Sequence, residues 1–86
     1  MSDIRFAQQA WEDYLYWQGQ DRKTLKRLNA RIRETIRSPY AGTGKAEPLK
    51  GNLQGCWSRR IDETNRLVYR VRGDAVEIVS CRGHYN

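Results

Sequence analysis

The sequence is short of the residues on which several common kinds of site depend. It has two cysteines, Cys56 and Cys81, and a single histidine, His84. Two cysteines are too few for a disulfide scaffold, and these two do not form a Cys-x-x-Cys pair. They also do not make the four ligands of a zinc site with one histidine unless carboxylates join. We therefore expect reduced, partly buried and inert thiols, no metal and no cofactor.

Long apolar runs are also missing. No window is apolar for long enough to cross a membrane, and the first residues, Met-Ser-Asp-Ile-Arg, lack the pattern of a signal peptide. These absences predict a cytoplasmic protein with no membrane partner. A chain of 86 residues has room for a modest core, so we expect one domain over residues 1–86.

Acidic residues are few in comparison with basic ones. The sequence has 10 Asp and Glu against 16 Lys and Arg, a net charge of +6. Such a surplus on a small body predicts an anionic partner, and nucleic acid is the first candidate. The alternative is a basic surface that serves only solubility. The three Trp, five Tyr and one Phe accompany the basic residues rather than form a separate block, which favours nucleic acid.

Two helices are predicted in the first half of the chain. The apolar positions 7, 10, 11, 14 and 15 follow the spacing of an amphipathic helix. We expect this helix to end at Gly19 and to place Trp11, Tyr14 and Leu15 in the core. Its Trp17 is left open between the core and a partner contact.

Asp21 is the predicted N-cap of a second helix that runs to about Arg37 and ends at Ser38-Pro39. The two helices should form an antiparallel hairpin. Apolar residues and one threonine mark the face expected in the core: Leu25, Leu28, Ile32, Thr35 and Ile36. The other faces carry seven basic residues: Arg22, Lys23, Lys26, Arg27, Arg31, Arg33 and Arg37. They are a solvated surface by default, with ribosomal RNA as the alternative contact.

The second half predicts a sheet. Residues 39–55 contain two Pro and four Gly and are expected to form a long loop with little regular structure. Four extended segments are predicted, with tight turns at 62–65 and 73–74: Ile4–Phe6, Cys56–Ile61, Arg66–Arg72 and Ala75–Arg82. This order indicates an α+β fold with both helices on one face of the sheet.

The opposite face of that sheet is expected to be rich in arginine. Alternation along 66–72 places Leu67, Tyr69 and Val71 on one face and a row of arginines, Arg66, Arg70 and Arg72, on the other. Arg59 or Arg60 of the neighbouring strand should join the row. An anion between the arginines is one interpretation. A solvated face with salt bridges to Glu63 and Glu77 is the other.

The side chains needed for metal-free RNA cleavage are present. A base must remove the ribose 2′ proton, an acid must protonate the leaving 5′ oxygen, and cations must neutralise the phosphorane. Glu47, His84 and the arginines suit these roles, because histidine titrates near neutrality and arginine pairs with phosphate through a planar fork. Trp57 and Tyr85 offer flat surfaces for unstacked bases.

Five segments together resemble one protein family. They are Asp-Tyr-Leu-Tyr-Trp-Gln at 13–18, Gly-Lys-Ala-Glu-Pro-Leu-Lys at 44–50, Trp-Ser-Arg-Arg-Ile at 57–61, Asn-Arg-Leu-Val-Tyr at 65–69 and Cys-Arg-Gly-His-Tyr at 81–85. In order and spacing they resemble YoeB-type toxins, which are ribosome-dependent mRNA interferases of the RelE superfamily from bacterial toxin–antitoxin modules. The resemblance covers nearly the whole chain.

The resemblance implies a microbial-RNase-like fold, with two N-terminal helices packed on a mostly antiparallel twisted sheet. It assigns the general base to Glu47, the transition-state arginine to Arg66 and the general acid to His84, with Tyr85 supporting the RNA and the reacting groups. Four further residues match RNA- or phosphate-contacting positions or extend that surface: Lys50, Arg59, Arg60 and Trp57.

The implied substrate is mRNA in the A site of the 70S ribosome, with contacts to 16S and 23S ribosomal RNA. The implied partners are a YefM-like antitoxin and a second copy of the chain in a homodimer. Three positions depart from the family pattern: Cys56 and Gly83, where the family carries aromatic residues, and Asn86, which follows the usual last tyrosine. The alternative is a non-catalytic RNA- or ribosome-binding module, or a gyrase-inhibiting relative on the same scaffold.

Overall fold

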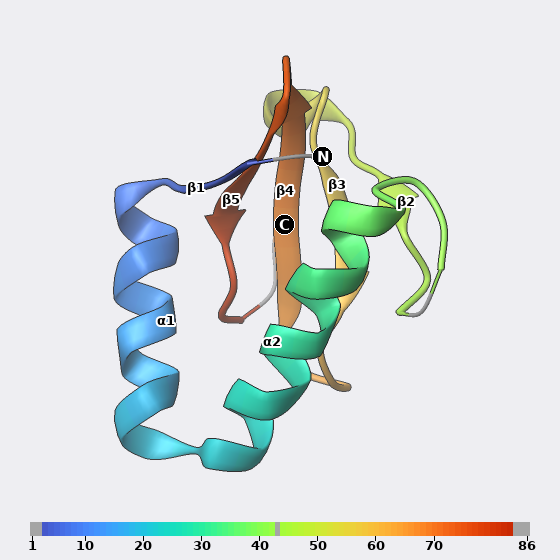
Figure 1. Cartoon of the computed structure of the whole chain (residues 1–86). Helices are drawn as coiled ribbons and strands as arrows, with labels where there is room; N and C mark the ends of the chain where they lie inside the picture. The colour runs from blue at the N-terminus through green and yellow to red at the C-terminus, as the bar shows by residue number, and fades with distance from the viewer. Residues whose placement is uncertain (1–2, 43, 84–86) are drawn as a thin grey trace.

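Two helices lie against one face of a five-stranded sheet (Figure 1). The structure is a computed structural model that describes residues 3–42 and 44–83. In chain order the elements are β1 (Asp3–Phe6), α1 (Gln8–Gln20), α2 (Arg22–Arg37), β2 (Glu47–Pro48), the short 3₁₀ helix η1 (Gly51–Leu53), β3 (Trp57–Arg60), β4 (Arg66–Arg72) and β5 (Ala75–Ser80). The α+β class and the pair of N-terminal helices are confirmed.

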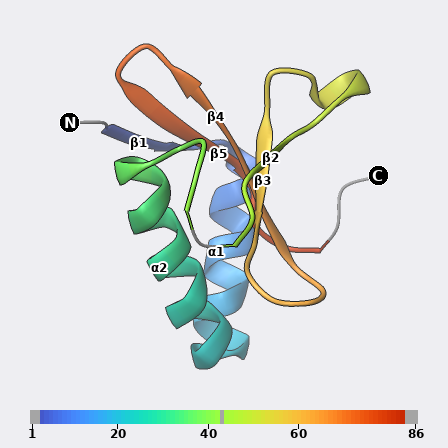
Figure 2. The same cartoon turned by 90° about the vertical axis from the view of Figure 1, so that its right-hand side faces the viewer.

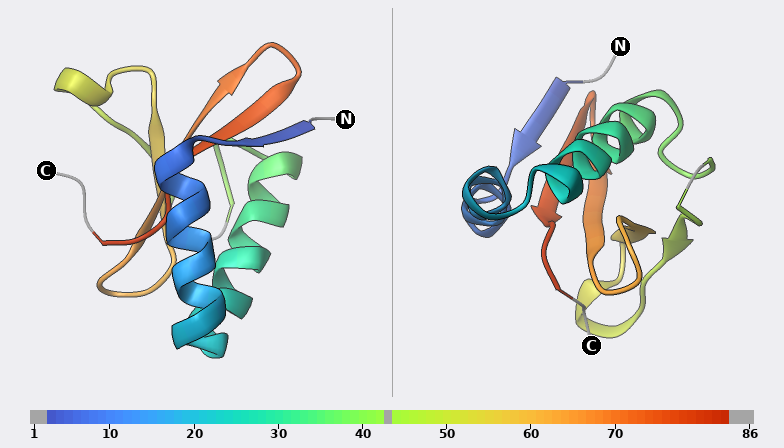
Figure 3. Two further views of the ribbon diagram at one scale, coloured as in Figure 1. Left: turned by 90° about the vertical axis from the view of Figure 1, so that its left-hand side faces the viewer. Right: turned by 90° about the horizontal axis from the view of Figure 1, so that it is seen from below.

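The sheet has the strand order β1-β5-β4-β3-β2. Only the β1–β5 pair is parallel among the described strands, and the other three pairs are antiparallel. Figure 2 shows α2 and η1 on opposite sides of this sheet, and Figure 3 shows α1 and α2 side by side on the same side. One face of the sheet is therefore covered by helices, and the other carries the segment around η1.

Helix α1 turns a different side toward the sheet from the one predicted. It buries Ala10, Asp13 and Trp17, whereas Trp11 is 48% and Leu15 is 45% exposed. The predicted core positions of Trp11 and Leu15 are therefore wrong. Apolar residues lie on two sides of this helix. The side that faces the sheet is the one from which the Trp17 indole and the Asp13 carboxylate form hydrogen bonds with the backbone of Cys81. Trp17 belongs to the core.

Helix α2 follows its predicted pattern. Asp21 alone separates it from α1, and the Asp21 carboxylate accepts hydrogen bonds from the backbone N–H groups of Lys23 and Thr24. That is the geometry of an N-cap. The helix ends at Arg37, before Ser38-Pro39, as predicted. Its expected core face is confirmed, with Leu28, Ile32 and Thr35 buried and Leu25 and Ile36 partly buried.

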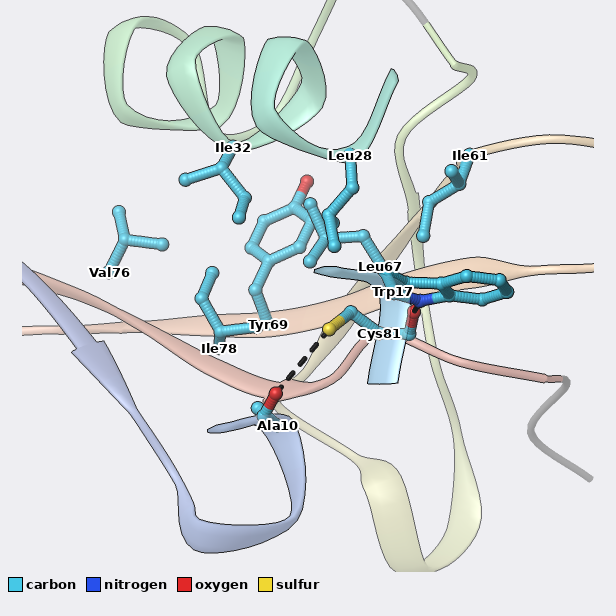
Figure 4. Close-up of a cluster of buried hydrophobic side chains, with 10 residues drawn as sticks. All are labelled: Ala10, Trp17, Leu28, Ile32, Ile61, Leu67, Tyr69, Val76, Ile78 and Cys81. Carbon is cyan, nitrogen blue, oxygen red and sulfur yellow. Dashed lines mark hydrogen bonds between the residues drawn. The ribbon is translucent and has the colours of Figure 1, made fainter. Parts of the chain in front are cut away.

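The main core fills the space between the helices and the sheet (Figure 4). Its ten buried residues are Ala10, Trp17, Leu28, Ile32, Ile61, Leu67, Tyr69, Val76, Ile78 and Cys81. Both cysteines are buried and free. Burial, and then the charge of nearby Asp13, raise the pKa of the Cys81 thiol to about 12. This thiol is a packing group at neutral pH.

A smaller cluster lies apart from the main core. It consists of Leu49, Cys56 and Val68, with Leu53 and Val79 packed against it. Because Val68 alternates with Leu67 and Tyr69 of the main core, this cluster belongs to the opposite face of the sheet. The predicted loop 39–55 therefore contains two short regular elements, β2 and η1, that cover part of this face.

The last strand is shorter than predicted. β5 ends at Ser80 rather than Arg82, because the backbone N–H and C=O of Cys81 bond to side chains of α1 instead of to the sheet. Neither helix has the length and apolar character that a membrane span requires, as far as residues 3–42 and 44–83 go.

Candidate functional site

Glu47 and Arg66 form an ion pair on the face of the sheet away from the helices. The Arg66 Nη1 atom lies 3.7 Å from Glu47 Oε1, and the two side chains are 22% and 45% exposed. Strand β3 brings them together, because Glu47 pairs with Ser58 and Arg60 of the same strand pairs with Arg66. The alternative interpretation, in which this arginine forms salt bridges to Glu63 or Glu77, is not what the structure shows.

Arg60 extends this cationic surface. It is exposed and lies directly across from Arg66, so the two side chains leave the sheet on the same face. Its backbone is fixed on both sides, since Arg60 N–H donates to Gly44 O at 2.8 Å and Arg31 Nε donates to Arg60 O at 2.9 Å. Lys50 is exposed two residues after β2. Both residues remain candidates for phosphate contact.

Arg59 lies on the other face, and its predicted contact with RNA is wrong. Its side chain is fully buried. One guanidinium nitrogen, Nη2, donates to Ser38 O at 2.8 Å and to Ala41 O at 2.7 Å, and the guanidinium lies over the Tyr69 ring. Adjacent residues of a strand point to opposite faces, so β3 gives Arg60 to the solvent and Arg59 to the interior. Arg59 ties the segment after α2 to the sheet.

Trp57 also faces the helix side of the sheet. It pairs across the strands with the buried Tyr69, packs against the main core and contacts the Tyr40 ring at a centroid distance of 4.9 Å. The structure therefore does not place Trp57 on the surface that carries Glu47 and Arg66. Trp57 therefore has a packing role on the helix side, and its predicted contact with RNA bases stays a prediction.

The remaining arginines of β4 are engaged with a carboxylate. Arg70 Nε donates to Glu77 Oε1 at 2.5 Å, and Arg72 Nη1 lies 4.0 Å from the same oxygen. This carboxylate raises the pKa of Arg70 through a hydrogen bond and through its charge. For Arg70 and Arg72 the salt-bridge interpretation is thus the correct one, and the arginine row is not continuous, because Val68 of the small apolar cluster interrupts it.

The predicted general acid His84, together with Tyr85 and Asn86, lies outside the described residues. The chain is described as far as Gly83, whose C=O accepts a hydrogen bond of 3.0 Å from the backbone N–H of Arg66. The chain thus reaches the arginine of the Glu47–Arg66 pair one residue before His84.

Sequence reasoning missed Asn65, the residue before Arg66. Its Oδ1 accepts a hydrogen bond of 2.8 Å from Gly83 N–H, and its Nδ2 donates to the Asp62 carboxylate. Asp62 in turn accepts from the backbone N–H groups of Thr64 and Asn65. The signal was present as Asp-x-x-Asn at the predicted turn 62–65, a spacing that side-chain-capped turns use.

Comparison with known proteins gives the family. A family model described as "YoeB-like toxin of bacterial type II toxin-antitoxin system" matches residues 6–85. The chain belongs to this family. It is 51% identical over 80 residues to Toxin YoeB of Escherichia coli K12, which covers 93% of this chain and 95% of the relative.

Solved YoeB structures have the same fold. The YoeB/ParE toxin from Agrobacterium tumefaciens has a TM-score of 0.94 at 44% identity, over 96% of this chain and 99% of that one. The toxin in a YoeB-YefM complex from Staphylococcus aureus has a TM-score of 0.89 at 42% identity, over 99% of both chains. A YoeB dimer from the same organism is similar, with a TM-score of 0.89 at 44% identity over 98% of both chains. The predicted RelE-superfamily fold is confirmed.

As a YoeB-family toxin, the chain combines a carboxylate and cationic side chains on one open surface. Across residues 3–42 and 44–83, no group of three or more His, Cys, Asp or Glu side chains is arranged to hold a metal ion. A carboxylate that accepts a proton next to a guanidinium that pairs with a phosphate oxygen suits phosphodiester chemistry.

Proposed function

We propose that this toxin cleaves mRNA in the A site of the 70S ribosome, without a metal ion, and so stops translation. Glu47 removes the proton of the ribose 2′-hydroxyl, and the 2′ oxygen attacks the phosphorus. Arg66, with Lys50 and Arg60, neutralises the phosphorane, and His84 gives a proton to the leaving 5′ oxygen. The products are a 2′,3′-cyclic phosphate and a 5′-hydroxyl.

The observation that carries this proposal is the 3.7 Å contact between Glu47 and Arg66. These residues belong to β2 and β4, which do not pair with each other in the sheet. A base and a phosphate ligand must both reach one nucleotide, and two groups this close can do so. Exposure of both side chains leaves the pair open to a substrate. The further roles of His84 and of Tyr85, which supports the RNA, rest on the family resemblance.

The same proposal covers the partners. The chain acts in the cytoplasm, where mRNA is translated. The basic residues of α2 that are exposed, Arg22, Lys23, Lys26, Arg27, Arg33 and Arg37, would contact 16S and 23S ribosomal RNA. A YefM-like antitoxin would neutralise the toxin, and self-association would give a homodimer, as YoeB-YefM and YoeB dimer structures exist for the relative from S. aureus.

The experiment is to map mRNA 5′ ends in a ribosome-containing extract with the parent and with Glu47→Gln. We expect new 5′-hydroxyl ends with the parent and a cleavage rate lower by about 10²–10⁴ in the variant, the range for loss of a general base. Arg66→Gln should lower the rate by roughly 10²-fold, the cost of one oxyanion donor.

Glu77→Gln is the matched control. It removes another carboxylate that pairs with an arginine of β4, but at Arg70 and Arg72. Its cleavage rate should stay within about twofold of the parent, as expected for a partly exposed pair outside the site. Translation arrest without new mRNA ends, equal in the parent and in Glu47→Gln, would show a non-catalytic binder. Brisk cleavage of free RNA would refute dependence on the ribosome.

A further inference from the structure

Two separate parts of the molecule hold the segment Cys81–Gly83. Helix α1 holds its beginning: the Trp17 Nε1–H group donates to Cys81 O at 2.8 Å, and Cys81 N–H donates to Asp13 Oδ2 at 2.9 Å. The three residues are buried, so both hydrogen bonds are shielded from water. They fix the chain where β5 ends.

The turn before β4 holds the other end of the segment. Gly83 N–H donates to Asn65 Oδ1 at 2.8 Å, and Gly83 C=O accepts from Arg66 N–H at 3.0 Å. The consecutive residues Asn65 and Arg66 thus form hydrogen bonds with the N–H and C=O groups of Gly83. The φ of Gly83 is +77°, a conformation that side chains disfavour, so glycine suits this position, where the family usually carries an aromatic.

Asn65 is suited to this contact because a carboxamide both accepts and donates. Its Nδ2 lies 3.2 Å from each Asp62 carboxylate oxygen, and this contact turns Oδ1 toward Gly83. A carboxylate at position 65 would face the Asp62 carboxylate, and an alanine would leave Gly83 N–H without its acceptor. The contact therefore depends on the pair Asp62 and Asn65 together.

We propose that Asn65 is a positioning residue for His84. It acts through Gly83, by fixing the residue that precedes the imidazole against the backbone of Arg66. The inference rests on the proposed function for the role of His84. It adds that the turn 62–65 acts on the reaction through the backbone of Gly83.

The test compares four variants with the parent: Asn65→Ala, Asn65→Asp, the double variant Asp62→Asn with Asn65→Asp, and the control Asn29→Ala. In the double variant the new amide at 62 donates to the new carboxylate at 65, which still accepts from Gly83 N–H. Asn29 is a matched control, because it also accepts one hydrogen bond of 2.8 Å, from Tyr14, and lies on α2.

Three kinds of measurement are made. Hydrogen exchange of the Gly83 amide reports the contact itself. The imidazole NMR signal reports the general acid and needs no assignment, because the chain has one histidine. The maximal cleavage rate and the half-saturating ribosome concentration report function.

In Asn65→Ala and Asn65→Asp we expect the Gly83 amide to exchange about tenfold faster, the factor for one hydrogen bond. The imidazole signal should move, and the maximal rate should fall about tenfold with the half-saturating concentration unchanged. The double variant should recover to within about threefold of the parent on each measure, and Asn29→Ala should match the parent.

An unchanged imidazole signal, or an unchanged maximal rate with a freely exchanging Gly83 amide, overturns the positioning role. A fall in rate that the double variant does not rescue also overturns it. A parent without cleavage activity refutes the proposed function instead, and the imidazole signal then still decides whether Asn65 fixes the chain at His84.

Discussion

Replacing Arg59 should lower the free energy of unfolding markedly. Replacing its neighbour Arg60 should leave that free energy almost unchanged. Arg59→Ala removes two hydrogen bonds from a guanidinium to carbonyl oxygens, each worth at least about 1.5 kcal/mol. It also removes the buried aliphatic stem of the side chain, worth about 2 kcal/mol. Relief from burying a charge offsets roughly 2 kcal/mol of this. The net loss is about 3 kcal/mol.

The assay is thermal and urea denaturation of Arg59→Ala and Arg60→Ala. A loss of about 3 kcal/mol lowers the melting temperature of a domain of this size by about 15 °C. Arg60 is exposed, so its truncation should change stability by less than about 0.5 kcal/mol. If Arg59→Ala is as stable as the parent but cleaves RNA slowly, Arg59 contacts the substrate and its assignment to the interior is wrong.

Three further outcomes concern Asp13, Cys81 and Asp62. Asp13→Ala leaves the Cys81 N–H without its acceptor and should cost about 2 kcal/mol in urea denaturation, whereas the exposed Glu12→Ala should cost less than about 0.5 kcal/mol. Because the pKa of the Cys81 thiol is raised to about 12, a Cys56→Ser chain should resist thiol-reactive disulfides at pH of about 8 until denaturant is added. Burial raises the pKa of Asp62, but hydrogen bonds from Asn65 and Thr64 outweigh it, so that pKa lies below its ordinary 3.8. As the pH falls, the Asp62 carboxylate therefore takes up a proton in the unfolded chain before it does so in the folded one. The stability that Asp62 contributes should be lost below a pH of about 4, and Asp62→Asn should lose less stability over the same pH range.

The helices show how far sequence patterns reach. In α2 the apolar residues lie on one face and the basic residues on the others, so its cap, its end and its buried face could all be predicted. In α1 Trp11 and Leu15 compete with Ala10 and Trp17 for the core. The choice depends on hydrogen bonds to Cys81, which is more than 60 residues away in the chain. No local pattern contains that information.

The site shows the same division. Glu47 and Arg66 were predicted from chemistry and resemblance, and their contact depends on the register of β2, β3 and β4. Alternation along β3 requires Arg59 and Arg60 to face opposite sides of the sheet. Arg59 is the one that faces inward, because the Ser38 and Ala41 carbonyls on that side accept hydrogen bonds from its guanidinium. The role of Asn65 depends on the distant Gly83 and is invisible to a reading of neighbouring residues.

The place of β5 in the sheet has a consequence for synthesis. This strand lies between β1 and β4, although it is made after every other described strand, and it supplies Val76 and Ile78 to the main core. In a nascent chain that lacks β5, strand β1 has no neighbouring strand to pair with. The two helices then lack the part of the core that Val76 and Ile78 supply. The sheet that carries the Glu47–Arg66 surface is therefore complete only after β5 has been synthesised.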